Sequence, residues 1–440
     1  MSVLKTNTWV TGAASGKTYI VGPLLGAGGQ GEVYRADLGD SSVALKWYFT
    51  QTGTKAQREA LEKLVKTGPP DRRFLWPMEL ATSKGIDAFG YVMPLREERF
   101  KSIVDLMKGR IEPSFRALAT AGFQLADSYL QLHARGLCYK DISFGNVFFD
   151  PETGDVLICD NDNVGYDGQE QGGVKGTARF MAPEVVTGEA SPSSATDLWS
   201  LSVLLFYLMM VHHPLEGRRE QAIRCLDLPA MTKLYGTEAL FIHDPGDESN
   251  RPVPGMQDNA IAFWPIYPQA LRDLFVRAFT DGIRRPRDGR VRESEWRGAM
   301  LRLRDAVYFC GGCGAENFYD GARQRAAGGQ PSECWFCHQR PAQLPWRIRL
   351  GSEVVMLNRD TKLYPHHVDD GRLYDFGAPV AAVTRHPTQP DVFGLENRTS
   401  DTWTVAMESA PPKEVPPGKT ATLAHGLKIR FGKKEGEVRA

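Results

Sequence analysis

The segment at residues 139–162, YKDISFGNVFFDPETGDVLICDND, constrains the fold of this chain more than any other stretch. Two apolar runs flank the turn sequence DPETGD, which indicates two strands joined by a turn. Asp141, Asn146 and Asp160 stand close together around these strands. A carboxylate can orient a substrate hydroxyl, and carboxylate and amide oxygens bind divalent cations such as Mg²⁺. The segment therefore predicts a catalytic site that holds a metal ion.

A glycine-rich segment, GAGGQGEV at residues 26–33, precedes this site in the sequence. Glycine lets backbone N–H groups approach phosphate oxygens closely, because no Cβ stands in the way. Lys46 follows in VALK, on a predicted strand whose alternation turns it to the same side as Ala44, inward under the glycines. The residues expected to contact a nucleotide here are Gly26, Gly28, Gly31, Val33, Ala44 and Lys46.

A carboxylate on the next predicted helix, at residues 55–66, is expected to hold Lys46 in an ion pair. Glu59 and Glu62 are spaced i, i+3 and share one face of that helix. We favour Glu62, because Val65 then follows at the spacing that packs the helix on the sheet.

A second glycine-rich stretch, GAASGKT at residues 12–18, is close to the phosphate-binding loop of P-loop proteins. It has one residue too few between its glycines, and a predicted strand rather than a helix follows. We interpret it as the turn before the first strand of the glycine-loop domain.

Motifs downstream continue the pattern: GTARFMAPE at residues 176–184, DLWSL around Asp197, and Arg290. Taken in order, all these motifs resemble those of serine/threonine protein kinases. The resemblance implies a bilobal fold in which Lys46 and the glycine-loop amides hold ATP phosphates. It also implies that Asn146 and Asp160 hold Mg²⁺, while Asp141 aligns the substrate hydroxyl.

The same resemblance assigns supporting roles. The Thr177 hydroxyl would bond to Asp141, Asp197 would orient the catalytic loop, and Glu184 would form a buried ion pair with Arg290. The strand at residues 90–95 would lead into the hinge between the lobes. Adenine would lie there against Met93 and use the backbone of Leu95 or Arg96, because Pro94 has no N–H to donate.

The chain departs from the kinase pattern at several positions. Tyr139 and Lys140 replace His-Arg before the catalytic Asp, and Lys140 lacks the bidentate fork of Arg. Ser143 stands where such kinases carry a Lys that neutralises phosphate charge. Asn161-Asp162 replaces Phe-Gly, which removes the packing switch of the Phe. Residues 161–176 contain no Ser or Thr, so we expect no required Ser or Thr phosphorylation there.

Two CxxC pairs, separated by twenty residues, lie in a Gly- and Cys-rich stretch at residues 308–340. This spacing is typical of a structural zinc site with four thiolate ligands. The expected ligands are Cys310, Cys313, Cys334 and Cys337.

Length and composition fit a chain of several domains. The 440 residues carry 53 basic and 53 acidic side chains, which gives no electrostatic argument for nucleic acid or an anionic membrane. No run reaches the roughly 18 apolar residues that span a bilayer, and LSVLLFYLMMV at residues 201–211 is interpreted as a buried helix. Seven cysteines without a disulfide pattern favour a reducing compartment, hence the cytoplasm.

We therefore predict an α+β chain with a kinase N-lobe at residues 1–95 and a helical C-lobe at 96–307. A zinc ribbon at 308–340 and a small all-β sandwich at 345–440 follow. The ending GLKIRFG loosely resembles the last strands of a forkhead-associated sandwich, although the Arg and Ser that read phosphothreonine in that family are not found.

The chain resembles bacterial kinases of tellurite-resistance-associated phosphorylation systems. The resemblance lies in the segments YKDISFGN, ICDNDN and FIHDPGDESN, together with the CxxC pairs. That resemblance implies partners: a von Willebrand A-domain protein and a PP2C-type phosphatase. Two alternatives stay open. One is an ATP-binding pseudokinase scaffold, which Ser143 favours, and the other is an interaction hub that works through its C-terminal domain.

Overall fold

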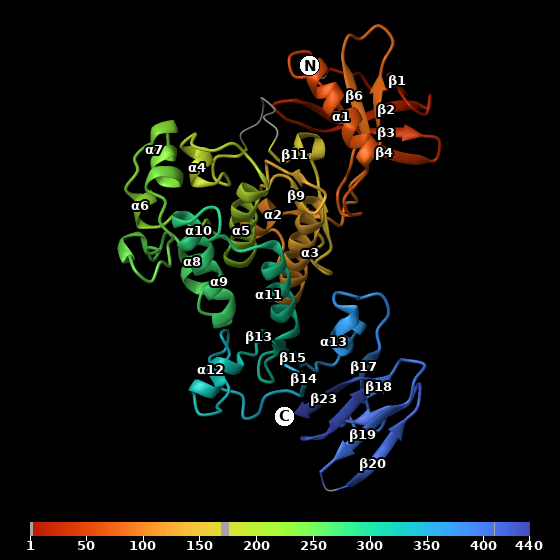
Figure 1. The fold of residues 1–440 in the computed structure, drawn as a ribbon, viewed down its shortest axis with the longest axis vertical. Helices are drawn as coiled ribbons and strands as arrows, with labels where there is room; N and C mark the ends of the chain where they lie inside the picture. Colours follow the sequence, from red (N-terminus) through yellow and green to blue (C-terminus); the bar gives the residue numbers. More distant parts are fainter. Residues whose placement is uncertain (1–2, 169–175, 409) are drawn as a thin grey trace. The chain divides into compact units, whose positions relative to one another are not determined.

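The computed structural model describes residues 3–168, 176–408 and 410–440. The chain divides into two compact units (Figure 1): residues 1–263 with 273–297, and residues 264–272 with 298–440. The finer boundaries at residues 95, 307 and 340 stay predictions.

A closed barrel forms the N-terminal part of the first unit, drawn red to orange in Figure 1. Its strands follow the order β1-β2-β3-β4-β6-β5, with the bounds β1 (Trp9–Gly12), β2 (Thr18–Ala27), β3 (Gly31–Leu38), β4 (Ser41–Tyr48), β5 (Glu79–Thr82) and β6 (Phe89–Pro94). Alternating apolar side chains fill its interior, among them Tyr34, Leu45 and Trp47, none more than 1% exposed. The strands predicted around Lys46 and at residues 90–95 are confirmed as β4 and β6, whereas β1 and β5 were not anticipated.

Helix α1 (Lys55–Thr67) packs on this barrel through a stripe that includes Leu61 and Leu64. The Thr54 side chain caps its N-terminus by accepting from the Gln57 N–H, and Gly68 with φ 70° ends it. Leu61 lies in one apolar cluster with Tyr48 and Met93, and Val65 packs against that cluster as expected.

Helices dominate the rest of the first unit: α2 (Ile103–Met107), α3 (Phe115–His133), α4 (Pro183–Val186), α5 (Ser194–Met210), α6 (Arg218–Gln221), α7 (Leu228–Thr232), α8 (Asp258–Phe263) and α10 (Asp281–Arg284). Helices α9 (Gln269–Phe279) and α11 (Glu293–Asp305) contribute to both units. Almost every residue of α5 is buried, which confirms the prediction of a buried helix. Within the described ranges, no helix combines the length and apolarity needed to cross a membrane.

Short strands flank the segment that carries Asp141, Asn146 and Asp160. One sheet has the order β10-β9-β7, formed by β7 (Lys101–Ser102), β9 (Val147–Phe149) and β10 (Val156–Ile158). A second pairs β8 (Leu137–Cys138) with β11 (Gly165–Tyr166). The turn at DPETGD joins β9 to β10, as the sequence predicted.

The second unit contains the cysteine pairs and the C-terminal sheets. The hairpin of β12 (Val307–Phe309) and β13 (Glu316–Phe318) precedes α12 (Gly321–Ala326). Two antiparallel sheets follow, with orders β15-β14-β23-β22-β19-β20 and β16-β17-β18-β21. Their strands are β14 (Arg347–Leu350), β15 (Glu353–Met356), β16 (Lys362–Leu363), β17 (Ala381–Arg385), β18 (Phe393–Asn397), β19 (Trp403–Met407), β20 (Ala410–Val415), β21 (Thr420–Thr422), β22 (Lys428–Phe431) and β23 (Lys434–Arg439).

One apolar cluster, which includes Ile348, Leu395 and Ile429, draws on both sheets, so they pack face to face. A short helix, α13 (Pro365–Val368), interrupts the strands.

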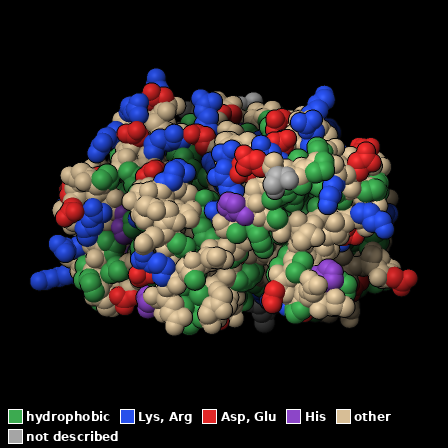
Figure 2. All heavy atoms as spheres, turned by 90° about the horizontal axis from the view of Figure 1, so that it is seen from below, with side chains coloured by type: hydrophobic (Ala, Val, Ile, Leu, Met, Phe, Trp, Pro, Cys, Tyr) green, Lys and Arg blue, Asp and Glu red, His purple; other side chains and the backbone are tan. Residues whose placement is uncertain are grey.

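On the face drawn in Figure 2, basic and acidic side chains are interspersed, in keeping with the balanced charge of the sequence.

Candidate active site

Asp141 lies in the loop between β8 and β9 and is held from two directions. The Thr177 backbone N–H and hydroxyl both donate to Asp141 Oδ1, each at 2.9 Å. Asn146 Nδ2 donates to the Asp141 backbone oxygen at 2.9 Å and to Oδ2 at 3.4 Å. Burial raises the pKa of Asp141. The structure thus brings together three of the predicted site residues.

Asp197, at the start of α5, orients the backbone that precedes Asp141. Its carboxylate accepts from the Tyr139 N–H at 2.6 Å and from the Lys140 N–H at 3.0 Å, and it lies 3.0 Å from His133 Nε2. Lys140 has a left-handed φ of 71°. A non-glycine residue keeps this conformation only where its surroundings hold it, and such residues cluster at active sites.

Tyr139 is fully buried, and its hydroxyl donates to the Cys159 backbone oxygen. Its ring packs edge-on against Tyr129, with centroids 5.6 Å apart. Tyr139 therefore ties the residue after β10 to the loop that carries Asp141.

Lys46 projects from β4 toward the polar turn η1 (Asn161–Asn163). Its ammonium forms an ion pair with Asp160, which has a left-handed φ of 54°. The Lys46 side chain is 7% exposed and that of Asp160 is 34% exposed. Burial and the neighbouring Asp162 carboxylate raise the pKa of Asp160 to about 6. Two predicted site residues that are 114 positions apart in sequence therefore meet here.

Asp162 is the second carboxylate on Lys46, at 2.8 and 2.9 Å from Nζ, and its side chain is fully buried. The Tyr48 hydroxyl also donates to it. This role was not predicted, although Tyr48 stands two residues after Lys46 and strand alternation puts both on one face.

The expected ion pair between Lys46 and Glu62 is not what the structure shows. Glu62 lies 3.4 Å from Arg58 and is about half exposed, and Glu59 pairs with Lys55. The buried stripe of α1 explains the difference. Gln57 precedes Leu61 by one turn and faces the site, whereas Glu62 is turned away from that stripe.

Asn161 stands at the position where the kinase pattern has the Phe that acts as a packing switch. It is fully buried, and its Nδ2 donates to the backbone oxygens of Leu75 at 2.9 Å and Ile158 at 3.0 Å. These bonds fix the turn that carries Asp160 and Asp162.

The glycine-rich segment forms a tight turn between β2 and β3, where the Gly28 N–H donates to the Gly31 oxygen at 2.9 Å. A Cβ at Gly31 would lie 2.2 Å from the Trp47 oxygen, so only glycine fits there. Around Gly26 and Gly28 a Cβ would meet nothing within 4 Å. Gln30, which was not predicted, reaches inward and accepts from Lys46 Nζ at 3.3 Å.

Four residues predicted to contact the nucleotide share one apolar cluster, namely Val33, Ala44, Met93 and Leu95. Arg96 differs from them in its side chain, which stacks on the Phe148 ring at 4.2 Å and donates to the Phe100 oxygen at 2.6 Å. Its predicted contact is through the backbone and does not depend on the side chain.

The turn at residues 12–18 binds a carboxylate of the chain itself. The buried Glu79 accepts from the Ala14 and Ser15 N–H groups at 3.2 and 3.0 Å, and from the Ser15 and Tyr19 hydroxyls at 2.7 Å each. A carboxylate therefore fills the place that a phosphate would take in a P-loop. The segment joins β1 to β2, in agreement with its interpretation as a turn that precedes a strand.

The predicted ion pair between Glu184 and Arg290 is confirmed. Arg290 donates from one nitrogen to both Glu184 oxygens at 2.6 and 2.8 Å, and from the other to the Ala195 oxygen at 2.7 Å. It fastens the region after Thr177 to α5.

In the second unit the four predicted cysteine sulfurs lie within 4.8 Å of one another. Cys310 and Cys337 are 3.8 Å apart, and Cys313 and Cys334 are 3.7 Å apart. Asn317 Nδ2 donates to Cys334 Sγ at 3.4 Å. Burial opposes ionisation of Cys334, but hydrogen bonds from the Cys337 backbone and from Asn317 outweigh it and lower its pKa to about 6.

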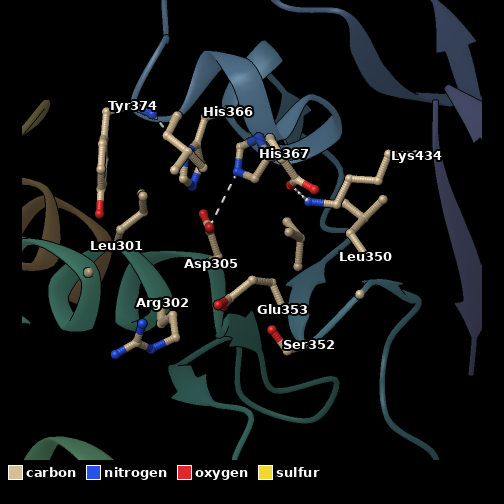
Figure 3. A pocket seen from close by; sticks show the side chains of 15 residues that line it. Leu301, Arg302, Asp305, Leu350, Ser352, Glu353, His366, His367, Tyr374 and Lys434 are labelled. Carbon is tan, nitrogen blue, oxygen red and sulfur yellow. Dashed lines mark hydrogen bonds and ion pairs between the residues drawn. The ribbon is translucent and has the colours of Figure 1, made fainter. Parts of the chain in front are cut away.

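A hollow of about 320 Å³ also lies in the second unit, between α11 and α13 (Figure 3). His367 points to Asp305 across it, with Nε2 and Oδ2 3.3 Å apart. His366 accepts from the Tyr374 N–H at 2.9 Å, and burial lowers its pKa to about 4. The histidines thus serve as partners for neighbouring groups of the fold.

Comparison with known proteins agrees with this geometry. The family model described as protein kinase domain matches residues 99–263, so this stretch of the chain is similar to protein kinase domains. The matched range includes Asp141, Asn146 and Asp160, while Lys46 precedes it.

Several protein kinases match over part of the chain. Protein kinase gsk3 of Schizosaccharomyces pombe is 27% identical over 162 residues, which cover 36% of this chain and 38% of that protein. The cell cycle serine/threonine-protein kinase CDC5/MSD2 of Saccharomyces cerevisiae is 29% identical over 141 residues, 29% of this chain and 19% of that protein. CBL-interacting serine/threonine-protein kinase 24 of Arabidopsis thaliana is 32% identical over 123 residues, 27% of this chain and 26% of that protein. The chain spans less than two fifths of the length of these relatives.

Proposed function

We propose that this chain is an active protein serine/threonine kinase, which transfers the γ-phosphoryl group of ATP to Ser or Thr hydroxyls of a partner protein and of itself. The observation that carries the proposal is the double hydrogen bond from Thr177 to Asp141. It holds a carboxylate in one orientation, in the unit where Lys46 also meets Asp160.

ATP would bind between the barrel and the helices, with adenine against the cluster of Val33, Ala44 and Met93. Lys46 and the amides of the glycine-rich segment would hold its phosphates. Asp141 would align the substrate hydroxyl and accept its proton. The hydroxyl oxygen would bond to the γ-phosphorus as the bond to the bridging oxygen of ADP breaks.

Mg²⁺ would be held by Asn146 and Asp160, whose donor set suits it. The Asn146 Nδ2 is used by Asp141, so its oxygen is the atom left for a cation, and Asp160 offers a partly exposed carboxylate. When bound, the metal neutralises charge on the phosphates.

The alternative is a pseudokinase that binds ATP and recruits partners. Ser143 favours it, because this residue is buried and brings no positive charge to the transferred group. Against it stand Lys46, Asp141, Asn146 and Asp160, all of which are present. Lys46 pairs with Asp160, and Asn146 donates to Asp141.

Zinc would be bound by Cys310, Cys313, Cys334 and Cys337 as a structural ion. A tetrahedral zinc with sulfur ligands at about 2.3 Å has sulfur–sulfur edges of about 3.8 Å. The Cys310–Cys337 and Cys313–Cys334 separations of 3.8 and 3.7 Å match that edge. Four protein ligands leave no open position for catalysis.

The proposed setting is a bacterial cytoplasmic signalling system with a von Willebrand A-domain protein and a PP2C-type phosphatase as partners. It is supported only by the sequence resemblance and by the cysteine usage. The face-to-face sheets at the C-terminus are proposed to form a forkhead-associated-like sandwich that docks a partner or the kinase lobes.

Phosphate transfer from γ-labelled ATP to a mixture of basic and acidic carrier proteins, compared between wild type and Asp141→Asn, tests the proposed kinase activity. Transfer by the wild type alone supports an active kinase. Saturable ATP binding with equal, background-level transfer by both proteins supports the pseudokinase.

A further inference from the structure

The buried Lys46 takes its carboxylate partners from one short turn. Asp160 and Asp162 both belong to the segment after β10, and both contact Lys46 Nζ. Helix α1 contributes no carboxylate in the described contacts, because Glu59 and Glu62 pair with basic residues on the exposed side of the helix.

Asp162 is held by three residues from two elements, β4 and α1. Lys46 and Tyr48 of β4 donate to its carboxylate, and Gln57 of α1 donates to its backbone oxygen at 3.1 Å. Gln57 also donates to the Tyr48 hydroxyl at 3.2 Å. The Asn161 side chain fixes the turn from the other side.

The two carboxylates on Lys46 differ in what they can reach. Asp160 is 34% exposed and is the proposed metal ligand, so a bound cation would share its charge. The Asp162 side chain is fully buried, and its oxygens are engaged by Lys46 and Tyr48. Burial of its side chain leaves no exposed oxygen to offer to a cation.

We propose that Asp162 is the positioning residue for Lys46 and takes the role expected of a carboxylate on α1. The inference rests on the proposed function for its catalytic consequence. It implies that the alignment of Lys46 is built into the turn that carries Asp160, and does not require a carboxylate from the helix.

The test compares removal of the negative charge at Asp162 with its removal at the glutamates of α1. Phosphate transfer by the wild type, and its absence in Asp141→Asn, are established first. The values of kcat and of KM for ATP are then measured for Asp162→Asn, Glu62→Gln and Glu59→Gln. We expect Asp162→Asn to lower kcat/KM about 100-fold and the two glutamate variants to stay within about twofold of wild type. A loss in Glu62→Gln as large as that in Asp162→Asn would overturn the inference.

A double-mutant cycle with Lys46→Met separates positioning from other roles. If Asp162 acts through Lys46, Asp162→Asn costs no further activity in the Lys46→Met background. A further loss there, with a raised Mg²⁺ requirement, would make Asp162 a metal ligand and overturn the inference. Tyr48→Phe, a milder change on the same carboxylate, repeats the cycle if Asp162→Asn does not fold.

Two further measurements distinguish a positioning role from general destabilisation of the fold. One moves the carboxylate to another residue, and the other measures nucleotide binding. Gln57→Glu should partly restore kcat/KM to Asp162→Asn by supplying a carboxylate from α1, and should lower it in the wild type by crowding like charges. ADP affinity, measured by calorimetry without metal, should fall in Asp162→Asn and Lys46→Met alike. This measurement tests the positioning role even if no transfer occurs, whereas unchanged ADP affinity in Asp162→Asn alone would contradict it.

Discussion

The Thr177 side chain and its own backbone N–H donate to the same oxygen of Asp141, Oδ1, each at 2.9 Å. This arrangement fixes the rotation of the Asp141 carboxylate, which leaves the direction of Oδ2 set. Two residues that are 36 positions apart in sequence are joined in this way. The position of Thr177 therefore affects the orientation of the Asp141 carboxylate.

Replacement of Thr177 by Val removes the hydroxyl but keeps the shape of the side chain. We expect kcat to fall about tenfold, because the general base is no longer held in one orientation. Thr177→Ser keeps the hydroxyl and should retain kcat within about threefold. Steady-state kinetics with saturating ATP decide the point. Equal rates for the Val and Ser variants would mean that the hydroxyl does not orient Asp141.

His133 links Asp197 to Glu293 and gives the fold a pH dependence. Burial lowers the pKa of His133, but hydrogen bonds with Asp197 and Glu293 outweigh it and raise the pKa from 6.5 to about 9. A group with a raised folded-state pKa stabilises fully below its unfolded pKa and loses that contribution as pH rises through the folded one. The contribution is thus complete below about pH 6.5 and lost by about pH 9 to 10.

Urea unfolding of wild type and His133→Gln measures this contribution. At about 1.4 kcal/mol per pKa unit, the difference in unfolding free energy between the two proteins should shrink by about 2–3 kcal/mol from pH 6 to pH 9. Using the difference cancels other groups that titrate in this window. A gap that stays constant, or that widens at high pH, would contradict the raised pKa.

The four-cysteine cluster should carry one zinc per chain when the protein is purified without chelator. Cys313→Ser removes one of four ligands and should lose most of that zinc and lower the thermal midpoint of the second unit. Cys225→Ser is the matched control, since Cys225 is an exposed cysteine of the first unit. Metal analysis that finds under half an equivalent in the wild type would count against the site.

Residues 161–176 offer no Ser or Thr for regulatory phosphorylation; residues 169–175 of this segment lie outside the described part of the structure. We expect full activity from protein in which mass spectrometry finds no phosphate on Thr177 or upstream of it in that segment. Phosphatase treatment should leave kcat within about twofold of the untreated protein. Loss of activity on treatment, traced to a phosphate on Thr177, would show that this expectation is wrong.

Much of the fold follows from periodicity. Alternation in GEVYRADL and SSVALKWY predicts β3 and β4, and the apolar run of α5 predicts a buried helix. Strands β1 and β5 are four residues each, and their pairing with each other joins distant parts of the sequence, which no local pattern indicates.

The site is predictable where its residues lie in one motif and less so where tertiary packing selects the partner. Asp141, Asn146 and Asp160 are ordered by a single hairpin. The partner of Lys46 depends on the rotation of α1 about its axis. The stripe of Gln57, Leu61 and Leu64 points away from Glu62, so the spacing within α1 itself disfavours Glu62 as the partner of Lys46.

Transfer of label from γ-labelled ATP with Mg²⁺ decides whether this chain is a kinase whose general base is Asp141. Wild type, Asp141→Asn and Thr177→Ser are compared at matched concentration, after calorimetry shows that all three bind ADP. We expect time-dependent incorporation by wild type and Thr177→Ser, and at least about 100-fold less by Asp141→Asn. Equal incorporation by wild type and Asp141→Asn would contradict the proposed kinase activity.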